Sequence, residues 1–172
     1  MSYFKIVKDP LDRKRLSKYF GMSLSNPGLP EQIKNIFWMY YIPEEGETWA
    51  MNTRKEAAFF GVTLLCAADR HEIFSDTSFE QMLPELMSKG TESAQRKLKS
   101  LFMSNMSRTV EFVETLGRVL RRDEMMAIVE DVNIEKLVTD LIQIENAYKS
   151  SYVKQRWASN LYRTDALIEE KE

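Results

Sequence analysis

The 172-residue sequence has one cysteine and one histidine, and this scarcity excludes several kinds of site. A single Cys66 forms no internal disulfide, and a structural zinc site needs about four Cys or His ligands. We therefore expect no metal and no cofactor. The apolar neighbours Leu65 and Ala67 predict that the Cys66 thiol is buried.

Glycine and proline are also scarce, with six and five residues, and they fall mainly between the periodic apolar segments, with Gly61 and Gly117 isolated inside predicted helices. No apolar run approaches the ~20 residues that span a bilayer, and the first residues lack the apolar core of a signal peptide. We therefore expect a cytoplasmic protein. Apolar residues make up 44% and charged residues 29%, which is typical of a folded globular chain. The composition favours an all-α fold.

Catalytic motifs are lacking as well. The sequence has no Walker pattern and no G-x-S-x-G, and His71-Glu72 has no second histidine four residues away. Glu111 and Glu114 lie one helical turn apart, but the Glu-x-x-His pairs of a carboxylate-bridged metal site are absent. We therefore predict that the protein is not an enzyme and that His71 is a surface or capping group.

The apolar periodicity predicts a bundle of about eight helices. Residues suited to open a helix precede the periodic segments: Asp9, Pro30, Asn52, Thr91, Ser107 and Asn133. The last expected helix spans residues 147–161 and buries Tyr148, Tyr152 and Trp157. Gly90 is the predicted boundary between two small helical lobes, residues 1–89 and 90–172.

Charge is segregated along the chain, although the formal net charge is only −2. Residues 96–122 carry seven Lys or Arg against two Glu, and residues 123–145 carry seven acids against one Lys. Residues 149–163 then carry four basic residues and no acid. Such segregation suggests that one face of a helical protein meets a polyanion, whereas ordinary solvated helix faces are the competing interpretation.

Three basic sets carry this hypothesis, and dispersed Lys and Arg of this kind bind phosphate backbones without reading bases. They are Arg96, Lys97 and Lys99; Arg118, Arg121 and Arg122; and Lys14, Arg15 and Lys18 with Arg13. The helix dipole explains one or two cations near a helix C-terminus, but not three. The alternative is that each arginine pairs with a nearby acid, such as Arg108 with Glu111 or Arg118 with Glu114.

Several segments resemble the small subunit of the type I-E CRISPR Cascade complex, the CasB family. Residues 152–162, Tyr-Val-Lys-Gln-Arg-Trp-Ala-Ser-Asn-Leu-Tyr, are similar to that family's closing helix, with its V-x-x-R-W-A-x-x-[FL]-Y pattern. Residues 95–102 are similar to its R-R-F-x-x-L-L segment, and residues 133–142 and 52–68 to two further helices. The resemblance covers most of the chain and is strongest in its last third.

The resemblance implies an all-helical, non-catalytic subunit that contacts the backbones of CRISPR RNA and target DNA and helps to hold the displaced strand. It implies other Cascade subunits as partners and self-association as two adjacent copies. Positions that match the family's nucleic-acid contacts are Arg54, Arg108, Arg118, Lys154 and Arg156, and Lys14, Arg15 and Lys18 fall near its N-terminal Arg-Arg site. With Arg96, Lys97 and Arg122 these form the predicted nucleic-acid-binding set.

Two other functions stay open from the sequence. One is an α-helical adaptor that binds another protein, with its charge segregation serving electrostatic steering. The other is a helical regulatory subunit of an enzyme. Salt-dependent binding to nucleic acid without sequence preference separates the Cascade interpretation from the adaptor.

Overall fold

A computed structural model describes residues 2–103, 108–146 and 148–171. The protein is all-α, as predicted: 62% of it is helical, and the described residues form nine helices and no strand. The helices are α1 (Pro10–Ser17), α2 (Glu31–Tyr40), α3 (Thr53–Ala67), α4 (Phe79–Lys89), α5 (Glu92–Met103), α6 (Thr109–Leu120), α7 (Asp123–Val129), α8 (Ile134–Gln143) and α9 (Ser150–Lys171).

The predicted helix starts are confirmed where the capping residue lies among the described residues. Asp9 caps α1 by accepting hydrogen bonds from the backbone N–H groups of Leu11 and Asp12. Asn52 and Asn133 cap α3 and α8 in the same way, and the Thr91 hydroxyl accepts from Ala94 N at 3.1 Å. The predicted cap Ser107 lies outside the described residues, and so does Ala147, the expected start of the last helix.

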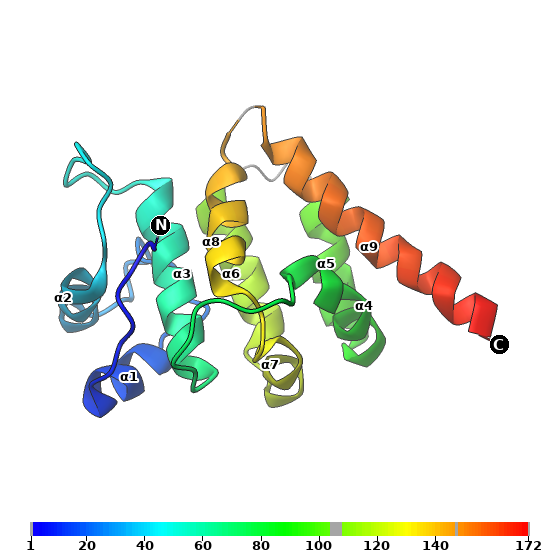
Figure 1. Ribbon diagram of the computed structural model, residues 1–172, viewed down its shortest axis with the longest axis horizontal. Coiled ribbons are helices and arrows are strands. Elements are labelled where there is room, and N and C mark those ends of the chain that lie inside the picture. The colour runs from blue at the N-terminus through cyan, green and yellow to red at the C-terminus, as the bar shows by residue number, and fades with distance from the viewer. Residues whose placement is uncertain (1, 104–107, 147, 172) are drawn as a thin grey trace.

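The residues of helix α3 from Lys55 to Cys66 are all buried. It packs against α1, α6 and α8, while α4 packs against α5, α7 and α9. Figure 1 shows α3, α8 and α6 next to one another, with α1 and α2 on one side of them and α4, α5 and α9 on the other. This arrangement buries the apolar stripes that the sequence predicts, the Cys66 thiol included.

One hydrophobic core contains side chains from all of these helices. Helices that precede residue 90 pack against helices that follow it: α3 packs most extensively against α8, and α4 against α9. The division into lobes at residues 1–89 and 90–172 stays a prediction.

The aromatic residues in and just before α9 correct one expectation. Trp157 is fully buried, as predicted, and Leu161 shares its side of the helix. Tyr148 and Tyr152, which are expected to be buried from the sequence, are 91% and 73% exposed. Five residues turn a helix by about 140°, so Tyr152 and Trp157 point to different sides, whereas Val153 and Trp157, four residues apart, share the buried side.

Candidate nucleic-acid interface

The glutamate at position 145 holds the first turns of α3 and α6 together. Its carboxylate accepts a hydrogen bond from the Thr53 hydroxyl at 2.5 Å and another from the Thr109 backbone N–H at 2.9 Å. A carboxylate is favoured here because helix N-termini present unpaired N–H groups and a partial positive charge. The two helices therefore begin side by side and run in the same direction, as Figure 1 shows.

At the other end of this pair, the turn after α1 lies directly on α6. A Cβ atom added to Gly117 would meet the backbone of Gly21, with its carbonyl oxygen only 2.7 Å away. Gly21 itself has φ +91°, a conformation that side chains disfavour. The Nε of Arg121 donates a hydrogen bond to the carbonyl of Phe20 at 3.1 Å and fixes the same contact. Two glycines thus bring together segments that lie about a hundred positions apart in the sequence.

This contact assembles four cations, which we name the basic cluster: Lys18, Arg118, Arg121 and Arg122. All four are exposed. None of them forms an ion pair within the part of the chain that the structure describes. Lys18 lies three residues before Gly21, so its Cα is at most about 11 Å from that glycine.

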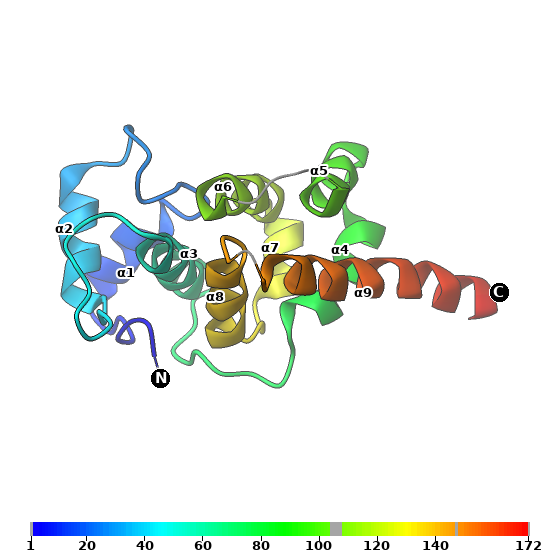
Figure 2. The same ribbon diagram turned by 90° about the horizontal axis from the view of Figure 1, so that it is seen from above.

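The predicted cations of α5 lie on a helix that packs against α6. Arg96 is exposed and Lys97 half-buried. A Cβ at Gly90 would lie 3.3 Å from Ala94 and from Met125, so the start of α5 is close to the start of α7, which follows Arg122. Figure 2 shows α5 and α6 on the same side of the molecule, with α8 and α9 on the other side. Arg96 and Lys97 thus extend the positive surface along α5.

The predicted cations of α1 differ in their partners: the Arg13 guanidinium lies 3.7 Å from a carboxylate oxygen of Asp69. Lys14 is exposed and Arg15 half-buried, and neither forms an ion pair among the described residues. Arg13 behaves differently, because its guanidinium is buried and donates hydrogen bonds to the carbonyls of Val7 and Arg70. Lys14, Arg15 and Lys18 are therefore the cations of α1 and its C-cap that remain available to a ligand.

Arg156 is bound inside the protein. Its Nε donates to Glu80 at 2.9 Å and its Nη2 to Asp140 at 2.5 Å, and both carboxylates are buried. Burial raises the pKa of Asp140, and the Arg156 guanidinium opposes that shift. Through these two contacts Arg156 joins α9 to α4 and α8. Removing Arg156 would leave two buried carboxylates without this partner. Its contact with nucleic acid stays a prediction.

Arg54 also has partners within the protein. Its guanidinium lies 4.6 Å above the centre of the Tyr3 ring, 3.5 Å from a Glu47 oxygen, and it donates to the Ile42 carbonyl. These contacts fasten the N-terminal segment and the loop before α3. They could not be predicted from the sequence, because the partners come from other segments of the chain.

Arg108 and Lys154 complete the predicted set. Arg108 is exposed at the N-cap of α6, beside a shallow cleft of about 470 Å³ that Met51 and Glu145 also line. It lies ten residues before Arg118, so the two are roughly 15 Å apart along the helix. Among the described residues neither arginine forms the predicted pair with Glu111 or Glu114; Glu114 accepts from the Ser23 hydroxyl instead. Lys154 is half-buried and interacts with a neighbour within the protein.

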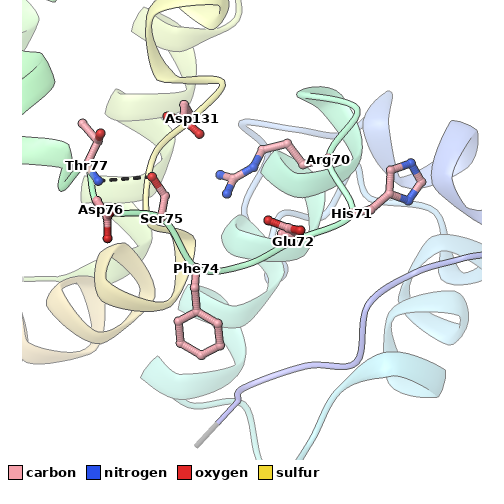
Figure 3. Close-up of a pocket in the computed structure, with 8 residues that line it drawn as sticks. All are labelled: Arg70, His71, Glu72, Phe74, Ser75, Asp76, Thr77 and Asp131. Atoms are coloured by element: carbon pink, nitrogen blue, oxygen red, sulfur yellow. Dashed lines mark hydrogen bonds between the residues drawn. The ribbon is translucent and has the colours of Figure 1, made fainter.

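A hollow of about 600 Å³ lies at the loop between α3 and α4. Figure 3 shows Arg70 reaching toward this loop, while His71 points away from it. The Arg70 guanidinium donates to the Val132 carbonyl. The lining also contains three carboxylates, Glu72, Asp76 and Asp131. Its net charge is negative, so this hollow does not attract phosphate.

No cluster of three or more His, Cys, Asp or Glu side chains among the described residues is placed to hold a metal ion. No helix in that part of the chain is both long and apolar enough to cross a membrane. Comparison with protein-family models found no match, and no curated protein and no solved structure matches the chain significantly.

The cations of the basic cluster are predictable from the sequence, but the contact that unites them is not. The available signal was Gly117 itself. A glycine inside a helix costs about 1 kcal/mol relative to alanine, so an isolated one usually has a packing reason. Its partner, Gly21, could not be identified without the fold.

Proposed function

We propose that this protein binds nucleic-acid backbones as a non-catalytic subunit of an RNA-guided CRISPR surveillance complex. One observation carries the proposal: the contact between Gly21 and Gly117 assembles Lys18, Arg118, Arg121 and Arg122, which are exposed and form no ion pair among the described residues. Four adjacent cations without acidic partners repel one another. A polyanion removes that repulsion, and releases its own counterions when it binds.

The chemistry of the cluster suits phosphate better than bases. Three of its four members are arginines, whose planar guanidinium groups meet phosphate oxygens bidentately and stay charged at any working pH. The exposed cations continue onto α5 through Arg96 and onto α1 through Lys14. A surface of this kind contacts a backbone over several nucleotides and fixes its position without reading sequence.

Such a surface is useful in an RNA-guided complex because sequence is read there by base pairing. Opening the target duplex exchanges one set of base pairs for another of similar stability, so backbone contacts from a protein can shift the balance. The proposal places this chain in the cytoplasm, next to other subunits and a second copy of itself.

The resemblance to the CasB family supports a shared helical architecture more strongly than it supports a nucleic-acid role. Its strongest segment, residues 152–162, includes the buried Trp157, Val153 and Leu161 and the internally paired Arg156. These residues pack α9, so the similarity there supports a shared helical architecture. The nucleic-acid role depends on the basic cluster.

Co-purification tests the proposal. The tagged chain, expressed in its own host, should bring down a short RNA of uniform length together with larger subunits. A chain that recovers proteins but no nucleic acid would be the adaptor, and one that recovers a single enzyme would be its regulatory subunit.

A further inference from the structure

The loop at residues 43–52, between α2 and α3, exposes a tryptophan almost completely. Trp49 is 96% exposed, and Met51 beside it is 45% exposed. Trp49 forms one wall of a small pocket of about 170 Å³, whose other apolar walls are Trp38, Tyr41 and Pro43. Tryptophan beside an apolar pocket is typical of the residues that dominate the affinity of protein interfaces. We propose that this loop docks a segment of another protein that carries Lys or Arg beside an apolar side chain.

The pocket is pre-formed, because a buried carboxylate organises the loop from within. Glu47 accepts hydrogen bonds from the Tyr41 hydroxyl at 2.7 and 2.8 Å, from the Lys55 ammonium at 2.6 Å and from the Glu44 backbone N–H at 3.0 Å. The Lys55 ammonium also donates to the carbonyls of Thr48 and Ala50. A loop held in this way loses little conformational entropy when a partner binds.

In this network the polar side chains of Lys55 and Glu47, which line the pocket, already have hydrogen-bond partners within the protein. All three donors of the Lys55 ammonium are used within the loop, and both oxygens of Glu47 are occupied. The ring of Trp38 is in turn packed against Phe37 at 5.1 Å between ring centres. The space between Trp49 and Tyr41 therefore fits an apolar group that needs no hydrogen bond.

The charge of the loop indicates which kind of ligand binds in the pocket beside Trp49. In residues 43–52, all of which are described, the exposed charged side chains are Glu44 and Glu45. Two exposed carboxylates on the same loop as Trp49 repel a phosphate backbone, so a nucleic acid that stacks on this ring is disfavoured. They attract Lys or Arg, and such a cation also gains from the face of an indole ring. The complementary ligand is thus a basic and apolar protein segment.

The loop and the basic cluster lie at opposite ends of the parallel pair of α3 and α6 (Figure 1). Asn52 caps α3, so the loop is at the N-terminal end of the parallel pair of α3 and α6. The basic cluster lies at the C-terminal end of α6. A protein partner and a nucleic acid can therefore bind at the same time, and the inference does not depend on the proposed function.

Photo-crosslinking tests the inference. A photo-reactive phenylalanine analogue replaces Trp49 in the tagged full chain, which is irradiated in its own host, and mass spectrometry identifies the attached segment. The same analogue at Phe74, an aromatic residue 63% exposed on another loop, is the control. The expected product is a protein segment with Lys or Arg close to an apolar residue, formed from position 49 and not from position 74.

The identified segment is then synthesised as a labelled peptide, and its affinity for the purified chain is measured by fluorescence anisotropy. Trp49→Ala should weaken binding about tenfold or more. The double variant Glu44→Gln/Glu45→Gln should weaken it less and reduce its salt dependence.

A crosslink to nucleic acid, a crosslink to a second copy of this chain, or none above the control would overturn the inference. So would a peptide that binds the Trp49→Ala variant as tightly as the wild type. A specific protein crosslink from a chain that recovers no RNA would retain the inference and refute the nucleic-acid proposal.

Discussion

Replacing Trp157 by alanine should destabilise the protein far more than replacing Tyr152, five residues earlier on the same helix. Trp157 is fully buried, with its ring centre 4.7 Å from that of Phe79, 5.6 Å from Phe112 and 6.3 Å from Phe102. Tyr152 is 73% exposed. Each variant removes one aromatic ring from α9. The ring of Trp157 is buried, whereas the ring of Tyr152 is exposed.

The magnitude follows from burial and ring contacts. Loss of a buried tryptophan costs about 3–5 kcal/mol, and the three aromatic contacts of Trp157 favour the upper half of that range, so we expect about 4–5 kcal/mol for Trp157→Ala. In a chain of this size 1 kcal/mol shifts the melting temperature by about 2–4 °C, which gives a decrease of about 8–20 °C. Tyr152→Ala should stay within about 0.5 kcal/mol of the wild type.

Urea denaturation followed by circular dichroism at 222 nm measures both variants, since the helical signal does not depend on the deleted ring. The reasoning is refuted if Trp157→Ala has the stability of the wild type. Equal losses in the two variants would refute it as well, because burial would then not decide the cost.

Three further predictions concern single residues. Gly117→Ala should destabilise by roughly 1–2 kcal/mol in the same urea assay, because its Cβ meets the Gly21 backbone at a cost that exceeds the ~1 kcal/mol gained in helix propensity; a more stable variant would contradict the close approach of the two backbones. Burial alone would raise the pKa of Glu47, but hydrogen bonds from Glu44 N–H, Lys55 and Tyr41 bring it to about 2. The stability that its carboxylate contributes is therefore complete above the ordinary value of 4.5 and lost as the pH falls toward 2, so the difference in Tm between wild type and Glu47→Gln should shrink across that window instead of staying constant. Burial raises the pKa of Cys66 to about 11, so Ellman's reagent at pH 7.5 should label it only after unfolding, and rapid labelling of the native chain would contradict its burial.

The sequence predicts this fold where the signals are local. Asp9, Asn52 and Asn133 were identifiable as caps because a capping side chain bonds to a backbone N–H only two or three residues away. Helix α7 was not predicted, since it has seven residues and begins after Arg122 with no side-chain cap. Its residues were visible only as an acidic stretch.

The candidate site was less predictable, because it depends on contacts between distant segments. The resemblance to the CasB family singled out Arg156 and Arg118 alike. Arg156 meets Glu80, 76 positions away, and becomes an internal tie, whereas Arg118 stays exposed next to the Gly21 contact. Nothing in the local sequence separates these two outcomes, which only the packing of α9 on α4 and α8 decides.

The salt dependence of target binding tests the central claim most directly. Three members of the basic cluster are changed together, Lys18→Ala, Arg118→Ala and Arg122→Ala. A control triple variant changes three lysines elsewhere, Lys5→Ala, Lys34→Ala and Lys89→Ala, and removes the same charge. Arg121 is kept in both because it holds the Phe20 carbonyl.

Affinity of the assembled complex for duplex targets is measured at several salt concentrations. We expect the cluster variant to bind more weakly to all target sequences, while the control keeps the wild-type slope of log K against log salt. The slope of the cluster variant should be shallower by about 0.9 for each phosphate that its side chains no longer neutralise. A cluster variant with wild-type affinity and an unchanged slope would show that the basic cluster does not bind nucleic acid.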